Sequence, residues 1–229
     1  MAGVKRQYDG TARRARAEKM RESLIETARA MLVADGYAAL TIPKVARACE
    51  VSVESVYKRF AGKPALVRAV VEEALRGIGP IAAETRSDAL SAADLPGLLH
   101  GWGRLSAEVG PRVAPILLLL DAAAGHDPEL ADLARELEED RRARMTENAL
   151  RLADAGHLPP GLPVRRVADI LLTYSSPQLY DLIVIRNGWT LDQYADFIST
   201  GIAAHLSARA DRTDTGPADT AFSGPGTQR

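Results

Sequence analysis

The chain has 229 residues, of which 46% are hydrophobic, and a formal net charge of −1. This length and composition allow a core to be buried in one or two domains. The single cysteine, Cys49, excludes an intrachain disulfide, and the longest apolar stretch, Ile116 to Leu120, is too short to cross a bilayer. Because no signal peptide is visible at the N-terminus, we expect a cytoplasmic protein.

Charge is divided unevenly along the chain. Residues 1–63 contain 13 Lys and Arg against 7 Asp and Glu, a net charge of +6, whereas the remainder carries −7. All five lysines lie in this first block. A basic N-terminal block on an acidic body is typical of a chain that brings one end to a polyanion, although basic runs can also be solvated faces.

The first fifteen residues show no sustained apolar periodicity, and we expect a disordered basic arm. Such an arm can reach into a minor groove of DNA or serve only as a solubilising tail. From about Arg16 to Asp35 apolar residues recur at helical spacing, and Gly36 predicts the end of this helix. The basic residues of the arm and of the helix start are Lys5, Arg6, Arg13, Arg14 and Arg16.

The segment from Thr41 to Lys63 predicts two short helices joined by a tight turn. Thr41 is a suitable N-cap with Pro43 in the first turn, and Ser52 would cap a second helix that runs to Phe60. This arrangement is the helix-turn-helix unit, whose second helix enters the major groove of DNA. Cys49 is interpreted as a small packing residue of this unit rather than as a redox sensor. The inward-facing residues would be Val45, Ala46, Cys49, Val56 and Phe60.

The same segment resembles the DNA-binding head of the tetracycline-repressor (TetR-type) family of bacterial transcription regulators. That family has a Thr opening the second helix of the head, a turn followed by Val, and a capped recognition helix ending in Tyr-x-x-Phe with a Lys soon after. Glu50 departs from the pattern, since the family usually has Gly there, and a positive φ would cost up to about 1 kcal/mol. Glu54 also departs, because it places a carboxylate near phosphates. The matching residues are Thr41, Ala46, Val51, Ser52, Tyr57, Phe60 and Lys63.

Roles at a DNA duplex follow from the resemblance and the residue types. The lysines would neutralise phosphates, with the amides of a helix N-terminus beside Lys63, and the hydroxyl side chains would hydrogen-bond phosphate oxygens. Val53 suits a thymine methyl group and Glu54 a cytosine amino group. The candidate DNA contacts are Thr41, Lys44, Ser52, Val53, Glu54, Ser55, Tyr57, Lys58 and Lys63.

After Lys63 the apolar spacing predicts a helix ending at Gly77, which in the resembled family transmits ligand binding to the head. From Ile81 to about Ala208 the body reads as helix throughout, without any strand pattern. Its run of arginines and carboxylates between 136 and 144 is interpreted as paired surface charge rather than as a catalytic carboxylate pair. The longest helix is predicted from about Pro128 to Ala155. Breaks between the helices of the body are predicted at Pro96-Gly97, Gly110-Pro111, Gly125 to Pro128, Gly156 to Pro163 and Asn187-Gly188.

Two apolar segments near the C-terminus predict a dimer interface. Segment 179–185 is apolar nearly all round, so a helix there must be covered on both sides. Thr190 and Gln193 form a capping box ahead of a clean apolar stripe. The resembled family dimerises through its last two long helices, packed as a four-helix bundle; the alternative is that this pair closes the monomer core. The candidate interface residues are Tyr180, Ile183, Val184, Tyr194, Ile198, Gly201 and Ile202.

Sequence motifs of catalysis and metal binding are absent. We find no P-loop, dinucleotide glycine fingerprint, G-x-S-x-G elbow or H-E-x-x-H, and the four histidines lack ligand spacing. We therefore expect no enzyme activity, no metal and no cofactor. Members of the resembled family usually enclose a small molecule in the body. The candidate pocket residues, each of which could equally be ordinary core, are His100, Trp102, Leu117, His126, Tyr174 and Tyr180.

The sequence thus predicts an all-α protein with an N-terminal three-helix DNA-binding domain and a helical-bundle body. We expect a regulator, in the first instance a repressor with an activator as the alternative, that binds a palindromic operator as a homodimer and responds to an unknown small-molecule effector. The rival hypothesis is a small-molecule-binding or enzymatic protein with a vestigial head, favoured by Glu50 and Glu54. The expected parts are a disordered arm (1–15), the helix-turn-helix domain (16–62), the ligand-binding and dimerisation domain (63–207) and a disordered tail (208–229).

Overall fold

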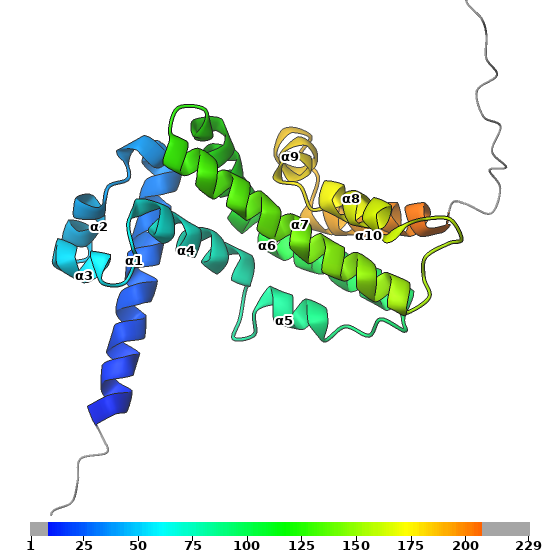
Figure 1. Ribbon diagram of the computed structural model, residues 1–229, viewed down its shortest axis with the longest axis horizontal. Helices are drawn as coiled ribbons and strands as arrows, with labels where there is room; N and C mark the ends of the chain where they lie inside the picture. The colour runs from blue at the N-terminus through cyan, green and yellow to red at the C-terminus, as the bar shows by residue number, and fades with distance from the viewer. Residues whose placement is uncertain (1–8, 208–229) are drawn as a thin grey trace, which may run out of the picture.

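The computed structural model describes residues 9–207, so the expectations for residues 1–8 and 208–229 lie outside the described residues. Within these limits the chain forms helices joined by short connections and contains no strand, which confirms the predicted all-α class (Figure 1). The elements are α1 (Asp9–Ala39), α2 (Ile42–Ala48), α3 (Val53–Tyr57), α4 (Lys63–Arg76), α5 (Ala83–Asp88), α6 (Leu95–Ala124), α7 (Pro128–Asp154), α8 (Val164–Tyr174), α9 (Pro177–Tyr180), the π-helical segment η1 (Asp181–Arg186) and α10 (Leu191–Ser207).

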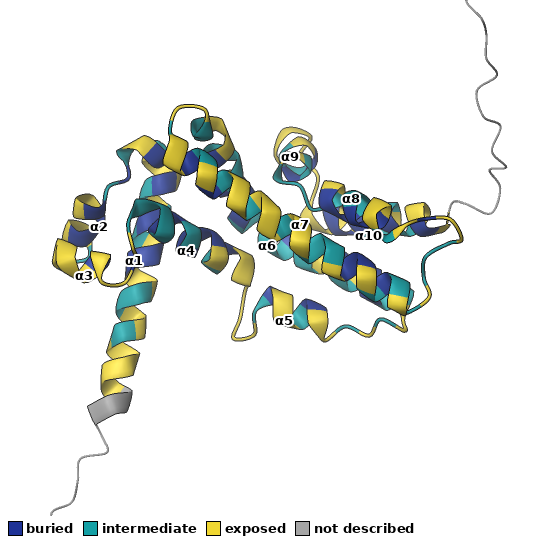
Figure 2. Cartoon of the chain, viewed as in Figure 1, coloured by how far each residue is buried: buried dark blue, intermediate teal, exposed yellow. Residues whose placement is uncertain are grey.

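Helix α1 begins earlier than its apolar periodicity predicts. Residues 9–15, expected in the disordered arm, form its first turns, because Ala and Arg are strong helix formers that propagate a helix without a buried face. Residues 12–15 are exposed, beyond the part of α1 that packs on the head (Figure 2). Gly36 interrupts the helix with φ 80° and ψ 172°, a conformation that Gly adopts readily, so the predicted stop is confirmed as a kink.

The core of the head extends beyond residue 62, the end of the expected helix-turn-helix domain. Leu24, Leu32 and Val56 from the head pack in one buried cluster with the apolar face of α4. The same cluster continues into the C-terminal half of α6 and the N-terminal half of α7. The head is therefore fixed to one end of the body by shared apolar packing. The members from α4, α6 and α7 are Leu66, Val67, Ala69, Val70, Val71, Ala74, Val113, Ile116, Leu120, Leu130 and Leu133.

The two longest helices of the body, α6 and α7, lie side by side (Figure 1). The predicted break at Gly110-Pro111 is wrong, because α6 continues through Pro111 and Pro115. A proline removes a helix hydrogen bond, but Ala107 and Ala114 on either side are buried, and this packing holds the helix together. Neither α6 nor any other described helix is long and apolar enough to cross a membrane.

A second core lies in the body, between α6, α7, α8 and α10. The capping box predicted for α10 is confirmed: the Thr190 N–H donates to Gln193 Oε1 (2.8 Å), and the Gln193 N–H donates to Thr190 Oγ1 (3.2 Å). A break before α9, where Ser176 caps the short helix, was not predicted. The buried residues of this core include Leu98, Trp102, Leu152, Leu171, Tyr180, Tyr194, Ile198 and Ile202.

Candidate nucleic-acid interface

Two hydroxyl side chains fix the start of α2 and of α3. Thr41 has an extended backbone, and its Oγ1 accepts the Lys44 N–H at 3.4 Å; Ser52 Oγ accepts the Ser55 N–H at 3.1 Å. Both predicted N-caps are therefore confirmed. Helix α3 is shorter than expected, because it ends at Tyr57 and the residues from there to Phe60 form a turn.

The turn between α2 and α3 depends on Glu50. Its φ is 54°, which makes it the one non-glycine residue with positive φ among the described residues. The Val51 N–H donates to the Ala46 carbonyl oxygen across this turn (2.9 Å), as in a Schellman ending with a left-handed residue after the helix. The position thus has the conformation for which Gly is preferred, and Glu adopts it with strain.

Helix α3 presents an exposed outer face above a buried inner one. Val56 and Phe60 are buried, whereas the side chains of Val53 and Tyr57 are 39% and 55% exposed. Glu54 and Lys58 are also exposed. Ser55 is exposed, but its Oγ lies 2.8 Å from Ser52 Oγ, so the hydroxyl is already engaged in the cap. The candidate base contacts therefore stand on a face that a DNA groove can reach.

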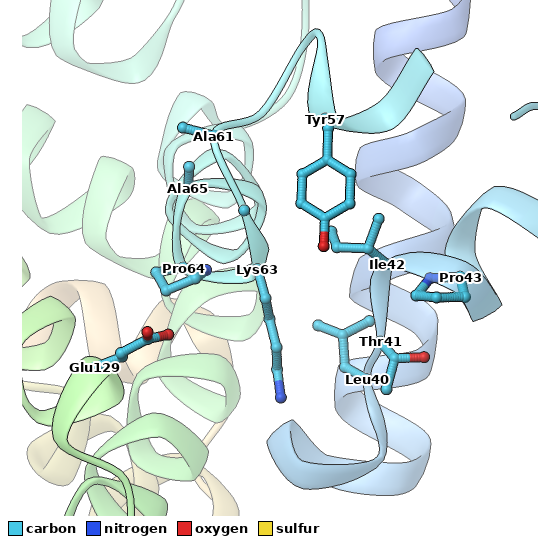
Figure 3. A pocket seen from close by; sticks show the side chains of 11 residues that line it. Leu40, Thr41, Ile42, Pro43, Tyr57, Ala61, Lys63, Pro64, Ala65 and Glu129 are labelled. Carbon is cyan, nitrogen blue, oxygen red and sulfur yellow. The ribbon is translucent and has the colours of Figure 1, made fainter. Parts of the chain in front are cut away.

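Three of the candidate phosphate contacts meet in one opening, which we call the head cleft. Its volume is about 660 Å³, and Thr41, Tyr57 and Lys63 lie around it (Figure 3). The first turn of α4 also borders it, and the N–H groups of Lys63 and Ala65 there have no partner within the helix. Hydroxyl donors, an ammonium and helix N-terminal amides are groups that hold a phosphate. The other residues that line it are Leu40, Ile42, Pro43, Ala61, Gly62, Pro64 and Glu129.

Lys63 is held against an aromatic ring at the inner side of this cleft. Its Nζ lies 3.6 Å from the centroid of the buried Tyr37 ring. Burial lowers the pKa of Lys63, while the nearby carboxylates of Asp127 and Glu129 act in the opposite direction. Burial and the same two carboxylates raise the pKa of Tyr37 to about 12, so its hydroxyl stays neutral. Lys63 is thus a cation with a fixed position, available to a phosphate.

Other charged residues of the head lie outside the cleft. The Lys44 Nζ donates to the Ala39 carbonyl oxygen (2.9 Å), which places this lysine at the end of α1. Arg47 and Arg59 are exposed basic residues that the candidate set omitted, although both belong to the basic block of residues 1–63. Glu129 was also missed, and no local signal could have identified it, because it reaches the head from the body.

The predicted pocket residues do not gather around one cavity. Trp102 is buried and donates its Nε1–H to Ser87 Oγ (3.0 Å), and the Tyr180 ring packs edge-on to Tyr194 (5.5 Å between centroids). His100 and His126 are both exposed, near opposite ends of α6. In the described part of the chain, no three His, Cys, Asp or Glu side chains could hold a metal ion. The bulky side chains marked from sequence are therefore mostly core or surface.

A different opening, the body cavity, lies between α6, α7 and α9. It has a volume of about 340 Å³ and includes Leu117 alone of the predicted pocket residues. Arg141 at its wall donates to Glu138, to the Leu172 carbonyl oxygen (2.7 Å) and to Ser175 Oγ (3.1 Å). Its guanidinium is therefore largely engaged within the protein. The full lining is Leu117, Leu120, Asp121, Ala134, Leu137, Glu138, Arg141, Pro177 and Gln178.

The residues predicted for the dimer interface are mostly covered by their own chain. Tyr180, Ile183, Tyr194, Ile198 and Ile202 are at most 6% exposed. Gly201 faces the Tyr174 ring, and Val184 is partly buried against the same core. The burial stripe of α10 thus packs against α6 within one chain, and the interface residues between two copies stay a prediction. The large apolar side chains left exposed in this region are Leu182, Ile185, Trp189 and Leu191.

The sequence and the structure were compared with those of known proteins. Residues 24–70 match the family model of the bacterial regulatory proteins, tetR family. No curated protein matches the sequence significantly.

Several solved structures share the fold over most of the chain at low identity. A protein of Syntrophomonas wolfei described as a TetR-family transcriptional regulator has a TM-score of 0.67 and 15% identity over 83% of this chain and 96% of its own. The fatty acid degradation regulator FadR from Bacillus halodurans has a TM-score of 0.62 and 14% identity, covering 84% and 97%. SmeT, solved as a complex with triclosan, has a TM-score of 0.61 and 16% identity, covering 87% and 100%.

Proposed function

We propose, from the match of residues 24–70 to the family model of the bacterial regulatory proteins, tetR family, that the chain is a ligand-responsive repressor that binds a palindromic operator as a homodimer. The observation that carries the proposal is the head cleft, where Thr41, Tyr57 and Lys63 gather beside the exposed face of α3. Phosphate contacts of this kind fix the register of a recognition helix, and side chains on its outer face read the bases.

Selection from random duplex DNA, followed by a salt series with the winning sequence, tests DNA recognition. We expect an inverted repeat with half-sites about one helical turn apart, and an affinity that falls steeply as salt rises. Transcription in vitro from a promoter overlapping that site should then decrease on adding the protein. An increase would instead make the protein an activator.

The rival function is a ligand-binding or enzymatic body with a vestigial head. Two carboxylates near the DNA-facing surface favour it: Glu54 on α3 and Glu129 in the head cleft. It predicts that selection returns no motif and that weak binding disappears at physiological salt. Salt-dependent, sequence-selective binding at physiological salt is incompatible with it.

For the dimer, we propose the exposed apolar surface formed by Leu182, Ile185, Trp189 and Leu191. Segment 179–185 is apolar nearly all round, yet its own chain covers only part of it, so Leu182 and Ile185 are 52% and 61% exposed. Burying such a patch favours association of two copies. Ile185→Glu should yield monomers in analytical ultracentrifugation, whereas Leu150→Glu, on an exposed apolar residue of α7, should leave the dimer intact.

For the effector, we propose the body cavity and a ligand with an apolar part and a hydrogen-bond donor or positive charge. Leu117, Leu120 and Leu137 supply an apolar wall. Since Arg141 already pairs with Glu138, the exposed Asp121 leaves the lining with excess negative charge. The triclosan complex of SmeT supports a small-molecule site in this fold.

Release of the operator tests this ligand class. A ten-carbon alkylamine and the carboxylate of equal length are titrated into the protein–operator complex. We expect release by the amine at lower concentration than by the carboxylate, which would approach Asp121 and Glu138 with like charge. The reverse order would contradict the proposed ligand chemistry without affecting the DNA-binding proposal.

A further inference from the structure

A part of the body reaches the head cleft. The connection between α6 and α7 brings Asp127 near enough to Lys63 to act on its charge. Glu129, at the start of α7, lies on the cleft wall (Figure 3). The Asp127 carboxylate is used as the N-cap of α7, where it accepts the Leu130 N–H at 3.1 Å. Glu129 lies in the first turn of α7 and is exposed. An exposed carboxylate therefore shares the opening with the groups suited to a phosphate.

This carboxylate acts electrostatically on the groups of the cleft. Asp127 and Glu129 both contribute to the raised pKa of Tyr37, and both oppose the lowering of the Lys63 pKa by burial. The Lys63 ammonium lies directly over the Tyr37 ring. A phosphate bound by Lys63 would thus be exposed to the same negative field, which repels it.

The position of Glu129 is fixed by the attachment of α7 to α4. Arg68 of α4 forms ion pairs with Glu136 and Asp140 of α7, at 2.7 Å each. Leu130 and Leu133 of α7 are buried in the core that includes the apolar face of α4. The backbone of Glu129 is therefore held beside the cleft by the packing of α7 on α4.

We propose that Glu129 limits the DNA affinity of this protein by repelling the phosphate held in the head cleft and by competing with it for Lys63. The inference rests on the proposed function, since it requires that the cleft receives DNA. Helix α7 also lines the body cavity through Ala134, Leu137 and Arg141. A shift of α7 on ligand binding would thus change the distance between Glu129 and the phosphate, in addition to any movement of α4.

The experiment compares Glu129→Gln with the wild type and with a matched control on the same helix. Asp154→Asn removes one negative charge from an exposed residue at the other end of α7, about 38 Å away along the helix axis, which is several screening lengths at physiological salt. Affinity for the selected operator is measured by fluorescence anisotropy at low and at physiological salt. Thermal unfolding is recorded for each variant, because Glu129 also favours the N-terminal turn of α7.

We expect Glu129→Gln to bind about three- to tenfold more tightly than the wild type at low salt, with a smaller gain at physiological salt because screening weakens the repulsion. Asp154→Asn should bind as the wild type does. Equal affinity of Glu129→Gln and wild type would overturn the inference while leaving the operator binding intact. An equal gain in Asp154→Asn would also overturn it, because net charge would then be the cause. If the wild type binds no DNA, the proposed function fails first.

Discussion

Head and body differ in how their sites are assembled. In the head, the segment from Thr41 to Lys63 supplies both N-caps, the tight turn and most of the lining of one cleft. In the body, the six residues predicted to line a pocket, which span His100 to Tyr180, do not surround one opening. Short-range geometry therefore determines the head site, whereas the body site is a product of how long helices pack.

The two regions also differ in what holds them. The core of the head continues through α4 into α6 and α7, so the head is anchored in the body rather than attached by a linker. The second core is closed by α10, which lies against α6. Substitutions in the core of the body should therefore change stability, whereas substitutions of charged residues in the head cleft should change DNA affinity.

The largest expected effect is at the crossing of α6 and α10. A Cβ at Gly103 would collide with the Ala195 carbonyl oxygen, which is backbone and cannot rotate away. We expect Gly103→Ala to lower the free energy of unfolding by about 3 kcal/mol, as overpacking of a core does. Denaturant titration measures this loss. Gly125→Ala, where no heavy atom lies within 4 Å of the added Cβ, should be nearly neutral; equal losses in both variants would contradict the close crossing.

Removing the Lys63 ammonium from the head cleft should lower the affinity for DNA rather than the stability of the fold. Lys63→Ala is expected to weaken binding about tenfold for operator and unrelated duplex alike, and to reduce the salt slope by about one, because one phosphate contact is lost. Anisotropy titrations over a salt series check both. Arg165→Ala, an exposed charge on α8, serves as the control. Lys63 would not be a phosphate contact if its variant changed base preference while general affinity remained the same.

A smaller effect on stability is expected where Glu108 of α6 forms hydrogen bonds with the segment that follows α4. Glu108 accepts from Arg86 Nη1 (2.9 Å) and from the Ile78 N–H (2.6 Å), and the Arg86 bond holds the pKa of this carboxyl below its usual range. A lowered pKa means that the stabilisation is present above the ordinary carboxyl pKa and is lost as pH falls through the lowered one.

Glu108→Gln should therefore be less stable than the wild type by about 1 kcal/mol at neutral pH. The difference should shrink as the pH falls through the lowered pKa of Glu108, since the wild-type carboxyl then becomes protonated. Denaturant midpoints across this range provide the measurement. A difference that stays constant with pH would mean that the charge of Glu108 contributes nothing.

The smallest effect concerns the turn of the head. Glu50 has φ 54°, so Glu50→Gly relieves strain, although the flexible Gly also stabilises the unfolded chain. We expect a net gain of about 0.5 kcal/mol in the free energy of unfolding, seen as a small rise in the denaturant midpoint. Val51→Gly, at the next residue, should destabilise the head. A loss of stability in Glu50→Gly would show that the carboxylate has a role that its backbone conformation does not reveal.

Sequence reasoning succeeded at the helix caps, where the signal is local. Thr41, Ser52 and Thr190 were recognised as caps because capping depends on a side chain and an N–H two or three residues away. The family model confirms the resemblance inferred from the motif that ends at Lys63. The same local reasoning failed at Pro111, where buried neighbours keep α6 continuous despite a strong breaker.

By itself, the sequence determined the all-α class, the helix-turn-helix and its two N-caps, since these follow from spacing within a few turns of chain. Only the tertiary structure decided that Tyr194 and Ile198 serve their own chain's core, because an apolar stripe does not specify which surface covers it. It also decided that Glu129 of the body stands beside Lys63 of the head, a neighbourhood produced by the packing of α7 on α4 across 66 positions of sequence.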